Sequence, residues 1–205
     1  MAFLRSNRLS FLWTLILIVS AVGSLSSHAT AQLITNLVVN NSTGYNMPYV
    51  VHTNTFAPGA VMYLDRTYTL TTVPSIVNNQ TWIQTANGDK GVLPGSSNFM
   101  SFTVGQSAKV YVAHDSHITV RPTWLTANFM DTGVEVTSQQ SSLGHFELFV
   151  NSYPAGATVT LGSNIPTGGG TSNSMYTVIV VPTATDTTAP TAPSTLQSTC
   201  NTIIT

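Results

Sequence analysis

The strongest structural signal in the chain is the segment FMSFTVGQSAKVYVAH, residues 99–114. Its apolar side chains recur at every second position in each half: Met100, Phe102 and Val104, then Ala108, Val110 and Val112. Successive side chains of a β-strand point to opposite faces, so the segment predicts two strands, each with one buried and one open face. Lys109 and Tyr111 are expected on the open face of the second strand.

The same rhythm continues outward through residues 33–181, with short runs at spacings of roughly 8–12 residues. The candidate strands are Leu33–Asn40, Met47–Thr53, Val61–Asp65, Thr81–Ala86, Phe99–Val104, Ala108–His114, Thr132–Ser138, His145–Val150, Ala157–Leu161 and Met175–Val181. Met175–Val181 is apolar on both sides, which favours a central strand that is covered on both faces. Pro122–Leu125 is compatible with one helical turn. We therefore expect an all-β fold, a two-sheet antiparallel β-sandwich of jelly-roll or immunoglobulin-like type.

The N-terminal residues 1–31 have the order of a secretion signal. Arg5 and Arg8 precede the apolar run Leu9–Val22, and the small residues end at Ala31. An uncleaved membrane anchor is the alternative, but the run is short of the about 20 residues that a membrane span needs. We therefore expect cleavage after about Ala31, a secreted, extracellular protein and no membrane partner after cleavage.

A composition change at Thr183 ends the β-rich module, 32–182. Residues 183–205 are dominated by Thr, Pro, Ala and Ser, which cannot bury a core, so this segment is predicted to be a linker. Asp186–Leu196 resembles the entry into a fibronectin type III module of bacterial secreted proteins, and this resemblance implies a downstream domain of the same protein. The single cysteine, Cys200, lies in this segment, so the module has no internal disulfide.

The charge of the chain excludes two classes of partner. Only 6% of residues are charged, against about 25% in an ordinary soluble domain. Once the two arginines of the signal are removed, four basic and seven acidic residues remain, a net charge of −3. Such a chain has no basic surface with which to neutralise nucleic-acid phosphates or anionic lipid.

Aromatic residues beside polar ones are candidates for carbohydrate binding. A sugar ring packs its C–H groups on an aromatic face, while its hydroxyls hydrogen-bond to polar side chains. The candidate platforms are Trp124, Tyr111 and Trp82, and the candidate polar partners are Asn87, Asp89, Lys90, Asp115 and Arg121. The alternative is that each tryptophan fills the core, which is favoured for Trp82 because its strand is expected to be central.

Three segments that hold these residues are Trp82–Lys90, Val110–Asp115 and Arg121–Leu125. Together they resemble a β-sandwich accessory module found beside polysaccharide-degrading domains in secreted bacterial proteins. The resemblance implies a polysaccharide or glycan partner, or a spacer role, and does not imply catalysis.

Two metal hypotheses follow from the polar residues. His114-Asp115-Ser116-His117 offers two imidazoles and a carboxylate for zinc, but needs a turn at Asp115-Ser116 to bring the two rings together. A structural calcium ion is the second possibility, with Asp89, Asp115, Asp131 and Glu135 as oxygen ligands. No other cofactor is indicated.

Catalysis is the least favoured hypothesis. No carboxylate pair indicates a glycosidase and no Gly-x-Ser-x-Gly motif occurs, although Asp131, His145 and Glu147 are free to converge. The favoured function is a non-catalytic, carbohydrate-binding extracellular module that positions a neighbouring domain. A structural or adhesive spacer without a sugar site is the alternative. Exposed Tyr111 and Trp124 would favour binding, whereas burial of every tryptophan would favour the spacer.

Overall fold

The structure is a computed structural model that describes residues 32–40, 48–140, 144–168 and 174–183. The predicted signal, the linker beyond Thr183 and Cys200 lie outside these residues. Within them, no helix is long and apolar enough to span a membrane.

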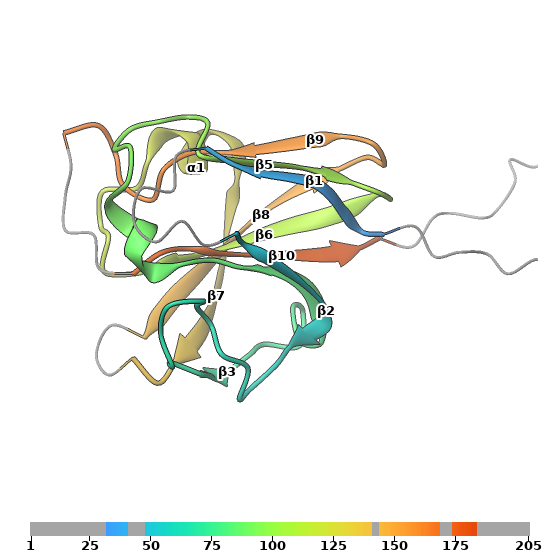
Figure 1. The fold of residues 1–205 in the computed structure, drawn as a ribbon, viewed down its shortest axis with the longest axis horizontal. Helices are drawn as coiled ribbons and strands as arrows, with labels where there is room; N and C mark the ends of the chain where they lie inside the picture. The colour runs from blue at the N-terminus through green and yellow to red at the C-terminus, as the bar shows by residue number, and fades with distance from the viewer. Residues whose placement is uncertain (1–31, 41–47, 141–143, 169–173, 184–205) are drawn as a thin grey trace, which may run out of the picture. The chain divides into compact units, whose positions relative to one another are not determined.

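Two antiparallel sheets form the domain, as the sequence predicts (Figure 1). The smaller sheet has the order β1-β5-β9, with β1 at Ile34–Val39, β5 at Met100–Val104 and β9 at Thr158–Leu161. The larger sheet has the order β2-β4-β10-β6-β8-β7-β3. Its strands are β2 Val50–Phe56, β3 Leu70–Thr72, β4 Gln80–Gln84, β6 Ala108–Asp115, β7 Met130–Ser138, β8 His145–Tyr153 and β10 Thr177–Pro182.

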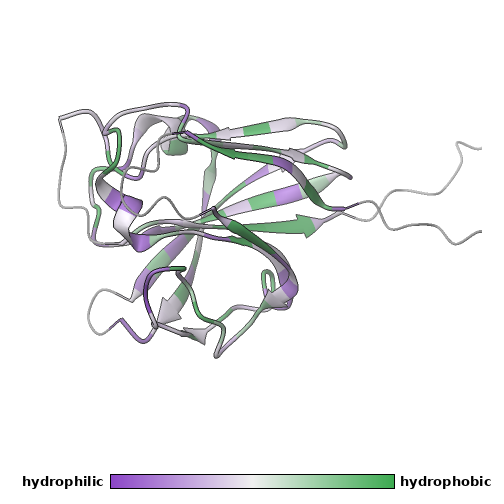
Figure 2. Ribbon diagram, in the orientation of Figure 1, coloured by the Kyte–Doolittle hydropathy of each residue, from purple (hydrophilic) through white to green (hydrophobic). Residues whose placement is uncertain are grey.

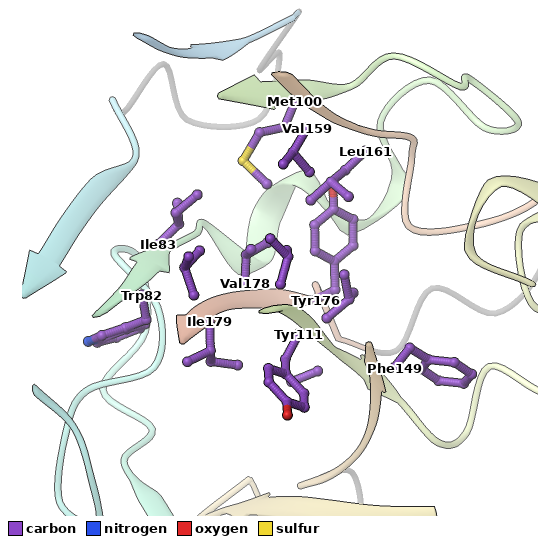
Figure 3. Close-up of a cluster of buried hydrophobic side chains, with 14 of the residues drawn as sticks. Trp82, Ile83, Met100, Tyr111, Phe149, Val159, Leu161, Tyr176, Val178 and Ile179 are labelled. Carbon is purple, nitrogen blue, oxygen red and sulfur yellow. The ribbon is translucent and has the colours of Figure 1, made fainter. Parts of the chain in front are cut away.

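The core lies between the sheets and also beneath the larger one. Apolar and hydrophilic residues alternate along the strands of both sheets (Figure 2). Val178 of β10 points toward Met100 and Val159 of the smaller sheet, whereas Ile179 points to the opposite side (Figure 3). Both Val178 and Ile179 are fully buried, so β10 is covered on both faces, as its continuous apolar run predicts.

The sequence predicts Tyr111 on an open face of its strand, and this prediction is wrong. Tyr111 points to the same side of the larger sheet as Ile179, to which it is paired in register, yet it is only 6% exposed. The segment between β2 and β4 lies on that side and contributes the buried side chains Met62 and Leu70 (Figure 1). The expected open face is therefore covered, and burial raises the pKa of the Tyr111 phenol.

Some elements differ from the expected ones. The predicted strand Val61–Asp65 makes only isolated bridges, Val61 to Thr69 and Tyr63 to Thr85, and the short β3 has no counterpart among the expected strands. The expected helical turn after Pro122 is present as α1, Thr123–Asn128. A 3₁₀ turn, η1, spans Asn87–Gly91.

Candidate functional site

A pocket of about 260 Å³ lies beside α1. It is lined by Gly95, Ser97, Pro122, Thr123, Trp124, Ala127, Asn128, Pro166 and Thr167. The polar lining residues therefore carry hydroxyl or amide groups, the lining also includes one tryptophan and two prolines, and no charged side chain is among the lining residues. Its volume is just below the about 300–1,000 Å³ of ordinary small-molecule pockets, which suits one ring-sized neutral ligand.

Trp124 forms the aromatic wall of this pocket but is only 8% exposed. Its indole N–H donates to the Ser163 carbonyl at 2.8 Å. The rings of Phe129 and Tyr176 meet it in edge-to-face contacts, with centroids 6.0 Å and 5.6 Å away. Trp124 therefore belongs to the core and is almost wholly covered, so it is not the exposed platform that the sequence suggested.

The segment Gly162–Ile165, after β9, joins the pocket to the polar residues. Asn164 donates its side-chain amide to the Ser174 carbonyl at 2.9 Å and accepts from the Tyr176 backbone N–H at 3.2 Å. The backbone carbonyl oxygen of Asn164 lies 2.9 Å from His114 Nε2. A Cβ atom on Gly162 would come within 2.2 Å of the Trp124 ring and 2.3 Å of the Ser96 carbonyl oxygen. Sequence reasoning missed this segment, and its one signal was Gly162, since glycine is favoured where other groups approach the backbone closely.

Arg121 is held by three groups rather than presented to solvent. Its Nη1 donates to His114 Nδ1 at 2.6 Å and to the Asp115 carbonyl, and its Nη2 pairs with Glu147. A guanidinium only donates and a carbonyl only accepts, so His114 must be neutral with its proton on Nε2. Burial lowers the pKa of His114 to about 4, and the Arg121 charge also lowers it, against the hydrogen bond to Asn164.

The η1 turn buries two of the predicted polar partners. Asn87 accepts the Met175 backbone N–H at 3.0 Å, and Asp89 accepts the Tyr49 hydroxyl proton at 2.8 Å. Burial, and then the Asp89 charge, raise the pKa of Tyr49. The turn is fixed by Asp65, whose carboxylate accepts the backbone N–H groups of Asn87 and Gly88 at 2.7 Å and 2.8 Å. Sequence reasoning did not single out Asp65.

The structure brings together some of the residues that the sequence predicted for sugar binding. Asp115, Arg121 and the Lys90 carbonyl connect through His114 and Asn164, but these contacts are internal and only Trp124 lines the pocket. Tyr111 lies elsewhere, on the other side of the larger sheet. Trp82 is buried, with its indole N–H donating to the Thr55 hydroxyl at 3.1 Å, as the core alternative predicts.

The four carboxylates proposed as calcium ligands do not cluster in the structure. Among the described residues, no three His, Cys, Asp or Glu side chains gather as metal ligands, so Asp89, Asp115, Asp131 and Glu135 do not form a site. Each carboxylate has a protein partner: Asp89 binds Tyr49, Asp115 Oδ1 binds His117, Asp131 binds the Gly133 N–H and Glu135 binds His145, while the buried Oδ2 of Asp115 has no hydrogen-bond partner. His114, which the zinc hypothesis pairs with His117, is buried with both ring nitrogens bound to protein groups.

The fold is similar to part of a known enzyme. No protein-family model and no curated protein matches the sequence. One solved structure, described as "The structure of a beta-glucuronidase from glycoside hydrolase family 2", matches with a TM-score of 0.64 and 23% identity. The match covers 73% of this chain and 15% of that chain. At this identity it shows the fold alone: the same sandwich recurs as a small part of a larger protein.

A second match is weaker. The structure described as a "GH138 enzyme targeting pectin rhamnogalacturonan II" has a TM-score of 0.42 and 10% identity, over 73% of this chain and 16% of that chain. A similarity of this size does not establish a shared fold.

Proposed function

We propose that residues 32–182 form a non-catalytic accessory β-domain of a secreted multidomain protein, and that the pocket beside α1 binds a neutral sugar ring. The pocket is the observation on which the binding proposal rests. Its polar lining residues are Ser97, Thr123, Thr167 and Asn128, whose neutral hydroxyl and amide groups suit the hydroxyls of a neutral sugar rather than a charged ligand.

Two further observations support the accessory role. The similar fold makes up only 15% of the β-glucuronidase chain, so in that protein it is one part among others. The surface of the present chain relies on neutral polar side chains, with only 6% of residues charged, which suits contact with neutral polymers or closely packed neighbouring domains.

A spacer without a sugar site is the second candidate, and a specific observation favours it. All three aromatic residues expected as platforms, Trp82, Tyr111 and Trp124, are buried. A flat polysaccharide surface therefore has no exposed platform among them, and binding would be confined to one ring inserted into the pocket.

Two adjacent helix positions distinguish these functions. Ala127 lines the pocket, whereas its exposed neighbour Thr126 does not. Ala127→Trp fills the pocket without removing a core contact, and Thr126→Trp adds the same bulk beside it. The wild type and both variants are run in affinity gels that contain xylan, β-glucan or galactan. The same three proteins are titrated with the matching monosaccharides and followed by NMR.

The proposal expects retention on at least one polymer, lost in Ala127→Trp and kept in Thr126→Trp, at unchanged melting temperatures. No retention on any of the polymers, or equal retention by both variants, would exclude the pocket as a sugar site and leave the spacer. The truncation Trp124→Ala is unsuitable here, because it removes buried packing and costs about 3–5 kcal/mol of stability.

A further inference from the structure

Two histidines from different parts of the chain meet at one end of the larger sheet. His117 lies in the turn after β6, and His145 is the first residue of β8. Their ring centroids are 6.4 Å apart with an interplanar angle of 66°. Both side chains are accessible, at 37% and 50% exposure. Neither belongs to the sugar pocket.

The backbone holds the two rings near each other. The Ser116 N–H donates to the His145 carbonyl at 3.0 Å, and the Ser116 hydroxyl donates to the same oxygen at 3.2 Å. The turn that carries His117 is therefore tied to the start of β8.

Each imidazole is oriented by a carboxylate. His117 Nδ1 lies 2.9 Å from Asp115 Oδ1, and His145 Nδ1 lies 3.0 Å from Glu135 Oε2. A carboxylate accepts hydrogen bonds, so in the neutral imidazoles Nδ1 carries the proton and Nε2 carries the lone pair. Within the described part of the chain, neither Nε2 has a hydrogen-bond partner. Metal-ligating histidines have this same arrangement, with a carboxylate on the second ring nitrogen.

We propose that His117 and His145 bind one divalent first-row transition metal ion, Cu²⁺, Ni²⁺ or Zn²⁺, through their Nε2 atoms, with water completing the coordination. At a metal–nitrogen distance of about 2.1 Å, the ion lies about 3.2 Å from each ring centre. Two rings that share an ion therefore have centres at most about 6.4 Å apart, which is the separation in the structure. A tetrahedral angle needs about 5.2 Å, so the exposed rings would approach each other by about 1 Å.

The local charge favours a cation. Asp115, Glu135 and Glu147 contribute three negative charges, and Arg121 contributes one positive charge that is paired with Glu147. Glu135 and Glu147 are paired in register on β7 and β8, beside His145. Two protein ligands make a more weakly binding and more readily exchanged site than a closed four-ligand site, and Cu²⁺ is expected to bind most tightly of the three metals.

The test uses the full chain without an affinity tag, at about pH 8, where imidazoles bind metals in their neutral form. Binding of Cu²⁺, Ni²⁺ and Zn²⁺ is measured by calorimetry, together with the Cu²⁺ electron paramagnetic resonance spectrum. The variants are His117→Ala, His145→Ala, their combination and Glu135→Gln, with His52→Gln as the control. Circular dichroism confirms that each variant is folded.

The proposal expects each single histidine variant to lower the affinity at least tenfold and the double variant to abolish the site. Glu135→Gln is expected to lower affinity about tenfold, because the carboxylate supports the ligand and is not one itself. His52→Gln should bind as the wild type, and the wild-type spectrum should show two equivalent nitrogen ligands. Equal binding by the wild type and the double variant, or no binding by the wild type, would refute the site and leave the sugar proposal untouched.

Discussion

Replacing His114 with glutamine should remove an acid-sensitive part of the stability. Burial and the Arg121 charge lower the pKa of His114 from its usual 6.5 to about 4. Between about pH 4 and pH 6.5, His114 is protonated in the unfolded chain but remains neutral in the folded protein. Stability therefore falls as the pH falls from 6.5 to 4 and is unaffected by this group above 6.5.

The size of the effect follows from the same two values. Each pH unit between them is worth about 1.4 kcal/mol, so the full window corresponds to about 3 kcal/mol. Glutamine keeps both hydrogen bonds, since its carbonyl accepts from Arg121 and its amide donates to the Asn164 carbonyl, but it does not titrate. Urea unfolding of the wild type and His114→Gln at intervals from about pH 7 to about pH 4 measures the difference.

The expected result is that the wild type loses about 3 kcal/mol more than His114→Gln across this window. Other groups titrate in both proteins, and their contributions cancel in the comparison. Parallel stability curves for the two proteins would show that His114 is not held neutral by its surroundings, and the account of the Arg121–His114–Asn164 contacts would then be wrong.

Two further substitutions test the packing around the pocket and the η1 turn. Gly162→Ala places a methyl group within 2.2 Å of the Trp124 ring and 2.3 Å of the Ser96 carbonyl, so we expect a loss of about 1–3 kcal/mol in urea unfolding. Gly59→Ala, which meets no atom within 4 Å, should lose only the about 1 kcal/mol that its positive φ costs, and an equal loss in the two variants would contradict the packing account. Tyr49→Phe removes the buried hydrogen bond to Asp89 and should cost about 1–3 kcal/mol; an unchanged unfolding midpoint would show that this contact does not stabilise the turn.

The candidate site is harder to predict than the strands. The sequence singles out Trp124 as an aromatic residue beside polar ones, and it does line the pocket. The other pocket residues have no sequence signature. Ser97, Ala127 and Thr167 are exposed residues that become neighbours only when the segment before β5, α1 and the segment after β9 pack together. Asn87 and Asp89, which the sequence offers as polar partners for a sugar, instead bind protein groups around the η1 turn.

The sequence by itself determined the strands and the layered β architecture, because alternation with a period of two is a local property of the backbone. Tyr111 shows what this alternation cannot predict. The alternation separates the two faces of β6, but it does not show that a segment distant in sequence covers the second face. Only the tertiary structure decided which polar groups hydrogen-bond to other protein groups, as Arg121 does with His114. It also decided which residues distant in sequence lie close together, as His117 and His145 do. Those contacts join residues from different strands, turns and loops, so they depend on strand order and tertiary packing, which a pattern read along one strand does not contain.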